Sequence, residues 1–192
     1  MLRSSKYFSE SYLTKERWMS YYYQVKETLN IIADKFSRAS HLSILEIGPG
    51  NKITSSLLSL FLRSSGITFD IITIDIDRRV RPNIVGDLRC LPFKSNEFDI
   101  SLAFEVLEYI LFEHVPLALE ELRRTTKEYV VLSLPHNSLY ITFAVKLPKL
   151  PLRTLFLRLF DLPLKPKHVG EYYWEIGVAK TIIIISLFLR KL

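Results

Sequence analysis

Apolar residues along the chain follow two different spacings, and the two alternate from the first third of the sequence onward. A helical spacing marks residues 14–36, 53–62 and 115–126. Continuous apolar runs, typical of strands that are covered on both faces, occupy residues 43–47, 69–75, 98–104 and 129–135. Strands that alternate with helices predict an α/β domain with a doubly wound, mostly parallel sheet and helices on both of its faces.

Acidic residues and glycines stand where these apolar runs end. Glu46 closes the first run, and Gly48 and Gly50 follow it around Pro49. Glycines let the chain turn sharply and let a ligand approach the backbone, and the following helix offers unpaired N–H groups at its N-terminus. An acid at this edge is costly to bury unless it binds a polar or charged group. The alternative is a purely structural turn with Glu46 reaching toward solvent.

The turn differs from a dinucleotide-binding turn, because Ile53 stands where the third glycine of that motif belongs. The pattern Glu46-x-Gly48-x-Gly50 instead resembles the first motif of the class I S-adenosylmethionine-dependent methyltransferases, and residues 40–137, roughly half of the chain, resemble their type 11 domain. The resemblance implies a Rossmann-like fold, with the turn holding the amino-acid end of S-adenosyl-L-methionine. Lys52 replaces a residue that is often small in the family, so either the turn is altered or the lysine reaches the cofactor carboxylate.

Two further segments extend the resemblance. Asp75 ends the second strand, where a carboxylate can accept both hydrogen bonds of a ribose diol, and we prefer it to Asp77 for this role. The segment from Gly86 to Phe93 resembles the family motif that recognises adenine. It implies that Asp87 accepts from the adenine amino group and that the backbone N–H of Leu88 donates to the ring. A type I turn started by Asp87 would explain only the first part of this match.

The fourth strand and the late part of the chain supply candidates for the methyl-transfer site. By resemblance, the segment at Phe104 and Glu105 leaves the fourth strand toward the transferred methyl group, and Phe104 contacts the cofactor. Candidate polar groups near the acceptor are Glu105, Glu108, His136 and His168. Each has a plain structural alternative: the acids suit a helix N-terminus, and the histidines suit loops. We expect Pro135, His136 and Asn137 to turn out of the sheet.

Length and composition narrow the class of protein. The 192 residues suit a single domain, which we divide into an N-terminal helical cover (1–40), a cofactor-binding core (41–137) and a lid with a divergent C-terminal part (138–192). We expect the usual C-terminal strands to be truncated. The net charge of +6 is spread along the chain, so it gives no strong nucleic-acid signal. One cysteine, no signal-peptide core and no apolar run near the ~20 residues of a membrane span favour a cytoplasmic protein.

Residues 138–167 mix large apolar residues with lysines and arginines, and prolines interrupt them. We expect this segment to be a lid over the pocket, although residues 140–162 also suit a peripheral membrane contact or a partner interface. The function predicted is methyl transfer to a small or medium-sized, partly apolar acceptor by a monomer or homodimer without a metal. A non-enzymatic cofactor-binding or interaction module and a membrane-peripheral methyltransferase with a lipid-like acceptor are the alternatives.

Overall fold

The computed structural model describes residues 14–145, 153–161, 176–177 and 180–188. The helices are α1 (Lys15–Lys35), α2 (Ile53–Ser65) and α3 (Val115–Thr125), with short 3-10 turns η3 (Arg78–Val80), η4 (Leu107–Tyr109) and η5 (Phe112–His114). The strands are β1 (His41–Ile47), β2 (Thr68–Asp75), β3 (Ile84–Val85), β4 (Phe98–Phe104), β5 (Thr126–Val145), β6 (Arg153–Asp161), β7 (Ile176–Gly177) and β8 (Lys180–Phe188).

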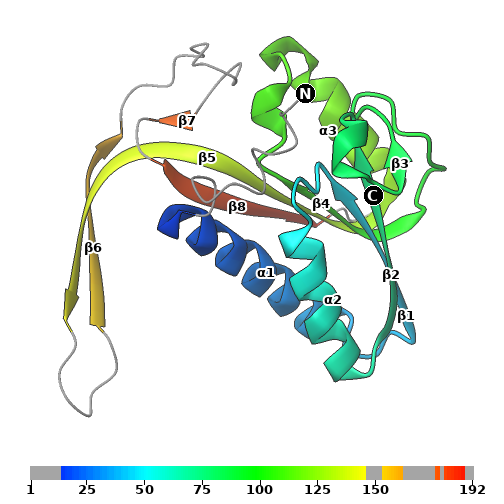
Figure 1. Ribbon diagram of the computed structural model, residues 1–192, viewed down its shortest axis with the longest axis horizontal. Coiled ribbons are helices and arrows are strands. Elements are labelled where there is room, and N and C mark those ends of the chain that lie inside the picture. Colours follow the sequence, from blue (N-terminus) through cyan, green and yellow to red (C-terminus); the bar gives the residue numbers. More distant parts are fainter. Residues whose placement is uncertain (1–13, 146–152, 162–175, 178–179, 189–192) are drawn as a thin grey trace.

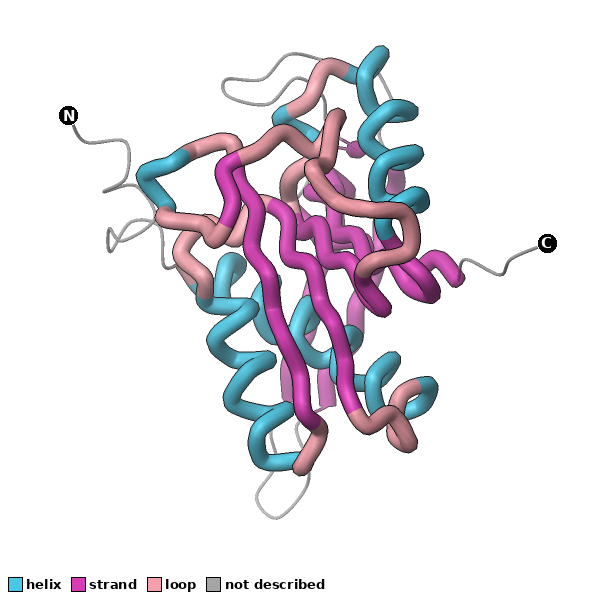
Figure 2. The backbone as a smooth tube through the Cα atoms, turned by 90° about the vertical axis from the view of Figure 1, so that its right-hand side faces the viewer, coloured by secondary structure: helices cyan, strands magenta, loops and turns pink. Residues whose placement is uncertain are grey.

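The described strands form one eight-stranded sheet in the order β3-β2-β1-β4-β5-β6, with β7 and β8 also paired to β5. Strands β1 to β5 are mutually parallel where they pair, and β6 and β8 run antiparallel to β5. Strand order reverses at β1, which lies between β2 and β4, and Figure 2 shows the strands of the sheet side by side. Ligands of such sheets bind beyond the carboxyl ends of the strands at this switch point. The predicted Rossmann-like α/β fold is confirmed.

Alternate residues of the central strands pack into two separate cores, one on each face of the sheet. Helices α1 and α2 cover one face, and α3 covers the other (Figure 1). Leu42 and Ile44 of β1 pack on the α1/α2 side, whereas Leu45 and Ile47 pack on the α3 side. Leu42, Ile44 and Leu45 are fully buried, and burying each such side chain contributes roughly 1.5–3 kcal/mol. This double coverage explains why the first strand reads as a continuous apolar run.

Helix α1 begins and ends where the sequence pattern predicts. Thr14 is its N-cap, and the Thr14 hydroxyl oxygen accepts from the Arg17 N–H at 3.3 Å. Phe36 is the C-cap, and its N–H donates to the Ile32 carbonyl. The inner face of α1 packs Val25, Ile32 and Phe36 against the sheet. The helix therefore lies against the sheet with its first turn near the carboxyl ends of the strands.

The predicted turn at Pro135, His136 and Asn137 is wrong, because β5 continues through these residues to Val145. Pairing with β4 ends at Ser133, and pairing with β7 starts at His136. Pro135 therefore falls in the interval between the two parallel ladders, where its missing N–H breaks no ladder bond on that edge. On the other edge β5 stays paired with β8 from Tyr129 to Asn137.

The described parts of residues 138–167 form an antiparallel hairpin, in which β5 pairs with β6 from Ser138 to Val145. In Figure 1 this hairpin extends away from the helices that cover the sheet. The lid prediction concerns the whole segment, and residues 146–152 and 162–167 lie outside the described residues. Within the described C-terminal part, β7 and β8 are added to the sheet without a further helix. None of the described helices has the length and apolarity that a membrane crossing requires.

Candidate functional site

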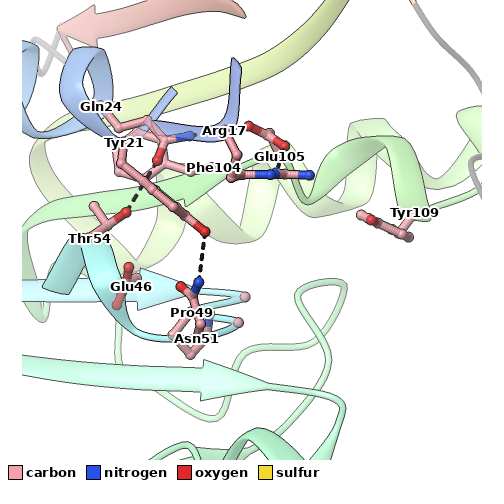
Figure 3. Close-up of a pocket in the computed structure, with 12 residues that line it drawn as sticks. Arg17, Tyr21, Gln24, Glu46, Pro49, Asn51, Thr54, Phe104, Glu105 and Tyr109 are labelled. Carbon is pink, nitrogen blue, oxygen red and sulfur yellow. Dashed lines mark hydrogen bonds and ion pairs between the residues drawn. The ribbon is translucent and has the colours of Figure 1, made fainter. Parts of the chain in front are cut away.

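A pocket opens at the carboxyl ends of β1 and β4, where the strand order reverses (Figure 3). Its walls come from α1, from the β1–α2 turn with the start of α2, and from the segment after β4. The lining residues are Arg17, Tyr21, Gln24, Glu46, Gly48, Pro49, Gly50, Asn51, Thr54, Phe104, Glu105 and Tyr109. The structure thus brings together four of the predicted cofactor residues, namely Glu46, Gly48, Gly50 and Phe104.

The β1–α2 turn is shaped by left-handed backbone at three positions. Gly48 and Gly50 have φ of 65° and 51°, and Lys52, the N-cap of α2, has φ of 61°. A Cβ on Gly48 would lie 2.5 Å from a methyl carbon of Val106, so only glycine fits there. The Lys52 Nζ donates to the Arg81 carbonyl at 2.5 Å, and Lys52 is not among the residues that line the pocket.

Glu46 lies beneath this turn with 3% of its surface exposed. Burial raises the pKa of its carboxyl to about 7, against the smaller opposing effects of a hydrogen bond from Ser55 and the charge of Lys52. Its Oε2 atom has no hydrogen-bond partner among the described residues. An unpaired carboxylate oxygen in a buried position is costly, so this atom is suited to a cationic or hydrogen-bond-donating ligand in the pocket.

A chain of buried polar side chains fixes α1 against this edge. Gln24, 2% exposed, donates from Nε2 to the Ser133 hydroxyl at 3.2 Å, and its Oε1 accepts from the Thr54 hydroxyl at 3.2 Å. In the same wall, Asn51 donates to the Tyr21 hydroxyl at 2.9 Å. These bonds connect α1 to β5, to α2 and to the β1–α2 turn, so the helix has a fixed position over the pocket.

Glu105 is held by contacts from two directions. Arg17 of α1 forms an ion pair with its Oε2 atom, and Gln24 Nε2 lies 3.5 Å from its Oε1 atom. Figure 3 shows the Arg17 and Glu105 side chains meeting across the pocket mouth. Glu105 also has φ of 53°, a left-handed conformation that costs a non-glycine residue energy, and its N–H donates to the Ser133 carbonyl at 2.9 Å. The surrounding contacts thus hold an acid in a strained position at the end of β4.

Asp75 and Asp77 follow β2 on the neighbouring strand end. Burial raises the pKa of Asp75, and its Oδ1 atom accepts from the Asp77 N–H at 2.8 Å. Asp77 instead caps η3 and pairs with Arg79 at 2.7 Å, which lowers the pKa of Asp77. The Asp77 carboxylate is therefore already neutralised by its own segment, whereas Asp75 has backbone partners only among its described hydrogen bonds.

Asp87 lies in the segment after β3, within a tight turn closed by the Cys90 N–H, which donates to the Asp87 carbonyl at 3.0 Å. Arg89 binds both carboxylate oxygens of Asp87, with the shortest contact at 2.5 Å, and lowers the pKa of Asp87. Leu88 is buried in the core on the α3 side, and Cys90 is exposed. Asp75, Asp87 and Leu88 do not line the pocket itself, so their proposed roles belong to a ligand that extends beyond it.

The remaining candidates differ in position. Glu108 is buried in η4, and its carboxyl is not among the pocket-lining groups. His136 lies within β5, opposite Thr181 of β8, and His168 lies outside the described residues. Catalytic roles for these residues and for Glu105 stay predictions. No group of three or more potential metal ligands is found among the residues that the structure describes.

Sequence reasoning missed Arg17, Gln24 and Thr54 as parts of this site. Aromatic residues are frequent at the start of α1: Trp18 and Tyr22 are exposed, while Tyr21 is buried with its hydroxyl in the pocket wall. A usable signal was present, since Arg17 and Gln24 share one helix face with Tyr21 and Thr28 at helical spacing. Polar residues on a buried helix face indicate buried hydrogen bonds, which is what the structure contains.

Comparison with known proteins agrees with this geometry. Residues 45–133 match the family model of a methyltransferase domain. Comparison with curated protein sequences gives no match.

Solved structures with the same fold include the DszA carbon methyltransferase, at 18% identity and a TM-score of 0.55 over 71% of this chain. A second is the selenomethionine-substituted CurJ carbon methyltransferase, at 16% identity and a TM-score of 0.56 over 70% of this chain. A third is the magnesium protoporphyrin IX methyltransferase ChlM from Synechocystis PCC 6803 with bound SAH, at 15% identity and a TM-score of 0.53 over 70% of this chain. The matches cover 39% of DszA, 39% of CurJ and 66% of ChlM, so this chain spans well under half of the first of these relatives.

The matched segment begins in β1, ends in β5 and includes every residue that we predict to bind the cofactor. At these identities the structural matches establish the fold, and the family model establishes the kind of domain. Residues 45–133 therefore match a methyltransferase domain, as the motifs predict, and the domain and its fold support a class I S-adenosylmethionine-dependent methyltransferase.

Proposed function

We propose that the protein binds S-adenosyl-L-methionine in this pocket and transfers its methyl group to a small or medium-sized, partly apolar acceptor. The observation that carries the proposal is the buried Glu46 carboxyl with an oxygen that lacks a partner among the described residues. The cofactor supplies an α-ammonium group, which would give that oxygen a charged donor. When bound, the cofactor also supplies an activated methyl group, so the protein has chiefly to position the reactants.

The neighbouring strand ends fit the rest of the cofactor. Asp75 remains our candidate for the ribose diol, because its carboxylate has a raised pKa and no cationic partner among its described contacts. Asp87 is our candidate for the adenine amino group, and Leu88 for the backbone donor. A carboxylate has about four acceptor sites, so Asp87 can bind Arg89 and still accept from adenine.

The partly apolar acceptor is supported by the side chains that border the pocket. Tyr109 lines the pocket and is 40% exposed, and Phe112, just beyond it, is 61% exposed. Trp18 is exposed and packs edge-on against the lining residue Tyr21, with ring centroids 5.9 Å apart. Exposed rings beside a polar pocket suit a molecule with an apolar portion and one reactive polar group.

Titration calorimetry with S-adenosyl-L-methionine and S-adenosylhomocysteine tests the proposal. Asp75→Asn and Asp87→Asn should each weaken binding roughly 10-fold to 100-fold, because each removes a charged acceptor from a ligand donor, a loss of about 1–3 kcal/mol. Asp77→Asn is the matched control and should change binding little, because we assign Asp77 no contact with the cofactor and its carboxylate caps η3. Transfer itself is measured as S-adenosylhomocysteine release with apolar hydroxyl- or amine-bearing acceptors.

Absence of binding by the wild-type protein up to about 1 mM of either ligand would overturn the proposed function. Binding that is equally sensitive to Asp77→Asn and Asp75→Asn would instead keep the function and reject the ribose assignment. Thermal unfolding of each variant separates a lost contact from a lost fold.

A further inference from the structure

We propose that Arg17 is a specificity-determining residue, whose guanidinium releases Glu105 and binds the carboxylate of the cofactor. The Arg17–Glu105 ion pair then competes with cofactor binding. This inference rests on the proposed function, because it assigns a partner to the amino-acid end of the cofactor. It concerns a residue of α1 that the cofactor motifs do not include.

The charges that line the pocket motivate the assignment. Two acids, Glu46 and Glu105, line it together with Arg17, the single cation among its twelve described lining residues. The amino-acid end of the cofactor carries one ammonium and one carboxylate. Glu46 suits the ammonium, which leaves the carboxylate in a pocket with one more acid and one cation. A carboxylate in such a place requires the cation, and a guanidinium can bind it through two parallel hydrogen bonds.

Lys52 is the other cation that sequence reasoning offered for this carboxylate. Its Nζ donates to the Arg81 carbonyl at 2.5 Å, and its side chain is not part of the pocket lining. The left-handed backbone at Lys52 places it as the N-cap of α2, where its conformation serves the turn. The geometry therefore favours Arg17 over Lys52.

Exchange is feasible because Glu105 would keep a partner after Arg17 leaves. Its Oε1 atom lies 3.5 Å from Gln24 Nε2, and Gln24 is itself fixed by Ser133 and Thr54. The backbone N–H of Glu105 stays bonded to the Ser133 carbonyl. The side chains of Arg17 and Glu105 are 22% and 15% exposed, so the pair is partly shielded from solvent and its competition with a ligand is measurable.

The variants Arg17→Gln and Glu105→Gln should move cofactor affinity in opposite directions. Arg17→Gln should weaken S-adenosyl-L-methionine binding about 10-fold or more, because it removes the cation. Glu105→Gln should tighten binding about 3-fold to 10-fold, because it removes the competing acid. The double variant should match Arg17→Gln alone, since Glu105 can compete only through Arg17.

Decarboxylated S-adenosylmethionine provides the probe that isolates the carboxylate. The wild-type protein should bind it more weakly than the intact cofactor, and neither Arg17→Gln nor Glu105→Gln should change its affinity by more than about 2-fold. Lys26→Gln is the matched control, because Lys26 is an exposed cation of α1 that does not line the pocket. It should leave the affinity for both ligands unchanged.

Calorimetry of these variants distinguishes the possible failures. If the wild-type protein binds neither ligand, the proposed function fails first. If the wild-type protein binds and Arg17→Gln weakens both ligands equally, Arg17 acts only by holding α1, and the inference is overturned. Unchanged or weaker binding by Glu105→Gln would likewise overturn the exchange, because a competing ion pair cannot be removed without benefit to its competitor.

Discussion

The predicted cofactor residues lie along one edge of the sheet, from Glu46 at one end to Asp87 at the other, and the acids at the two ends have opposite environments. At the pocket end, Glu46 is buried with an unpaired oxygen, and its pKa is raised to about 7. At the other end, Asp77 and Asp87 are each paired with an arginine two residues further along the chain, and their pKa values are lowered. One end therefore has a carboxylate oxygen without a described partner, whereas Asp77 and Asp87 at the other end each already bind an arginine.

This difference indicates which end of the site lowers the stability of the fold. A buried acid without a full set of partners lowers the free energy of unfolding, so its presence is costly unless a ligand uses it. A short-range pair such as Asp87 with Arg89 costs the fold little and contributes little. The variants below should separate the two ends by the size and the pH dependence of their effects on stability.

The largest effect is expected from Gly48→Ala at the pocket end. A Cβ there would meet Val106 at 2.5 Å in a left-handed backbone, so we expect a loss of roughly 2–4 kcal/mol in the free energy of unfolding. Gly86→Ala at the other end is the matched variant. Its Cβ would meet the terminal methyl of Ile74 at 2.7 Å, a flexible group, so about 1 kcal/mol is expected.

Urea denaturation of the two variants without ligand measures this difference. Equal losses would mean that Val106 moves aside as easily as the end of Ile74, and that the pocket turn is less tightly packed than its geometry indicates.

The next effect is a pH dependence caused by Glu46. Because burial raises its pKa from 4.5 to about 7, the folded protein holds this proton more strongly than the unfolded chain. The free energy of unfolding should therefore fall as pH rises from about 4.5 to about 7 and then level off. Relative to Glu46→Gln, the wild-type protein should lose on the order of 2–3 kcal/mol between pH 5 and pH 8.

Denaturant unfolding of both proteins across this pH range, without ligand, provides the measurement. A gap between them that is constant with pH would show that Glu46 titrates at its ordinary value and that the pocket end is not strained by burial. Saturating cofactor should reduce the wild-type loss at pH 8, since the ligand stabilises the charged carboxylate.

The smallest effects are expected at the paired end. Asp77→Asn should cost about 0–1 kcal/mol at pH 7, because its pair with Arg79 is near the surface. Its lowered pKa gives the opposite sign to Glu46: the contribution is present above the unfolded pKa and is lost as pH falls through the folded pKa. In thermal unfolding, the loss caused by Asp77→Asn should thus be smaller at pH 3 than at pH 7. A larger loss at pH 3 would contradict this account.

Much of this edge could be predicted from the chain, because local chemistry determines it. Glu46, Gly48 and Gly50 were identified as a ligand-binding turn, and they do line one pocket. The strands around them are continuous apolar runs, since α1 and α2 cover one face and α3 the other. Each of these features depends on the residues of one short segment, so it can be recognised in a single sequence.

The parts that sequence reasoning missed depend on contacts between distant segments. The Arg17–Glu105 pair joins residues 88 positions apart, so no local pattern indicates that these two side chains meet. The turn predicted at Pro135 is wrong, because the position of this proline between two ladders depends on where β4 stops and β7 starts. Both errors concern tertiary placement and not the kind of element.

The exposed thiol in the Asp87–Cys90 turn makes the protein its own spectroscopic probe. Cys90 is the one cysteine in the sequence, so a thiol-reactive dye labels a single known position without any engineered substitution. That position lies in the turn that contains Asp87, at the end of the edge away from Glu46. A fluorescence titration of labelled protein would therefore follow events at the end that we propose for adenine, independently of calorimetry, which records both ends together.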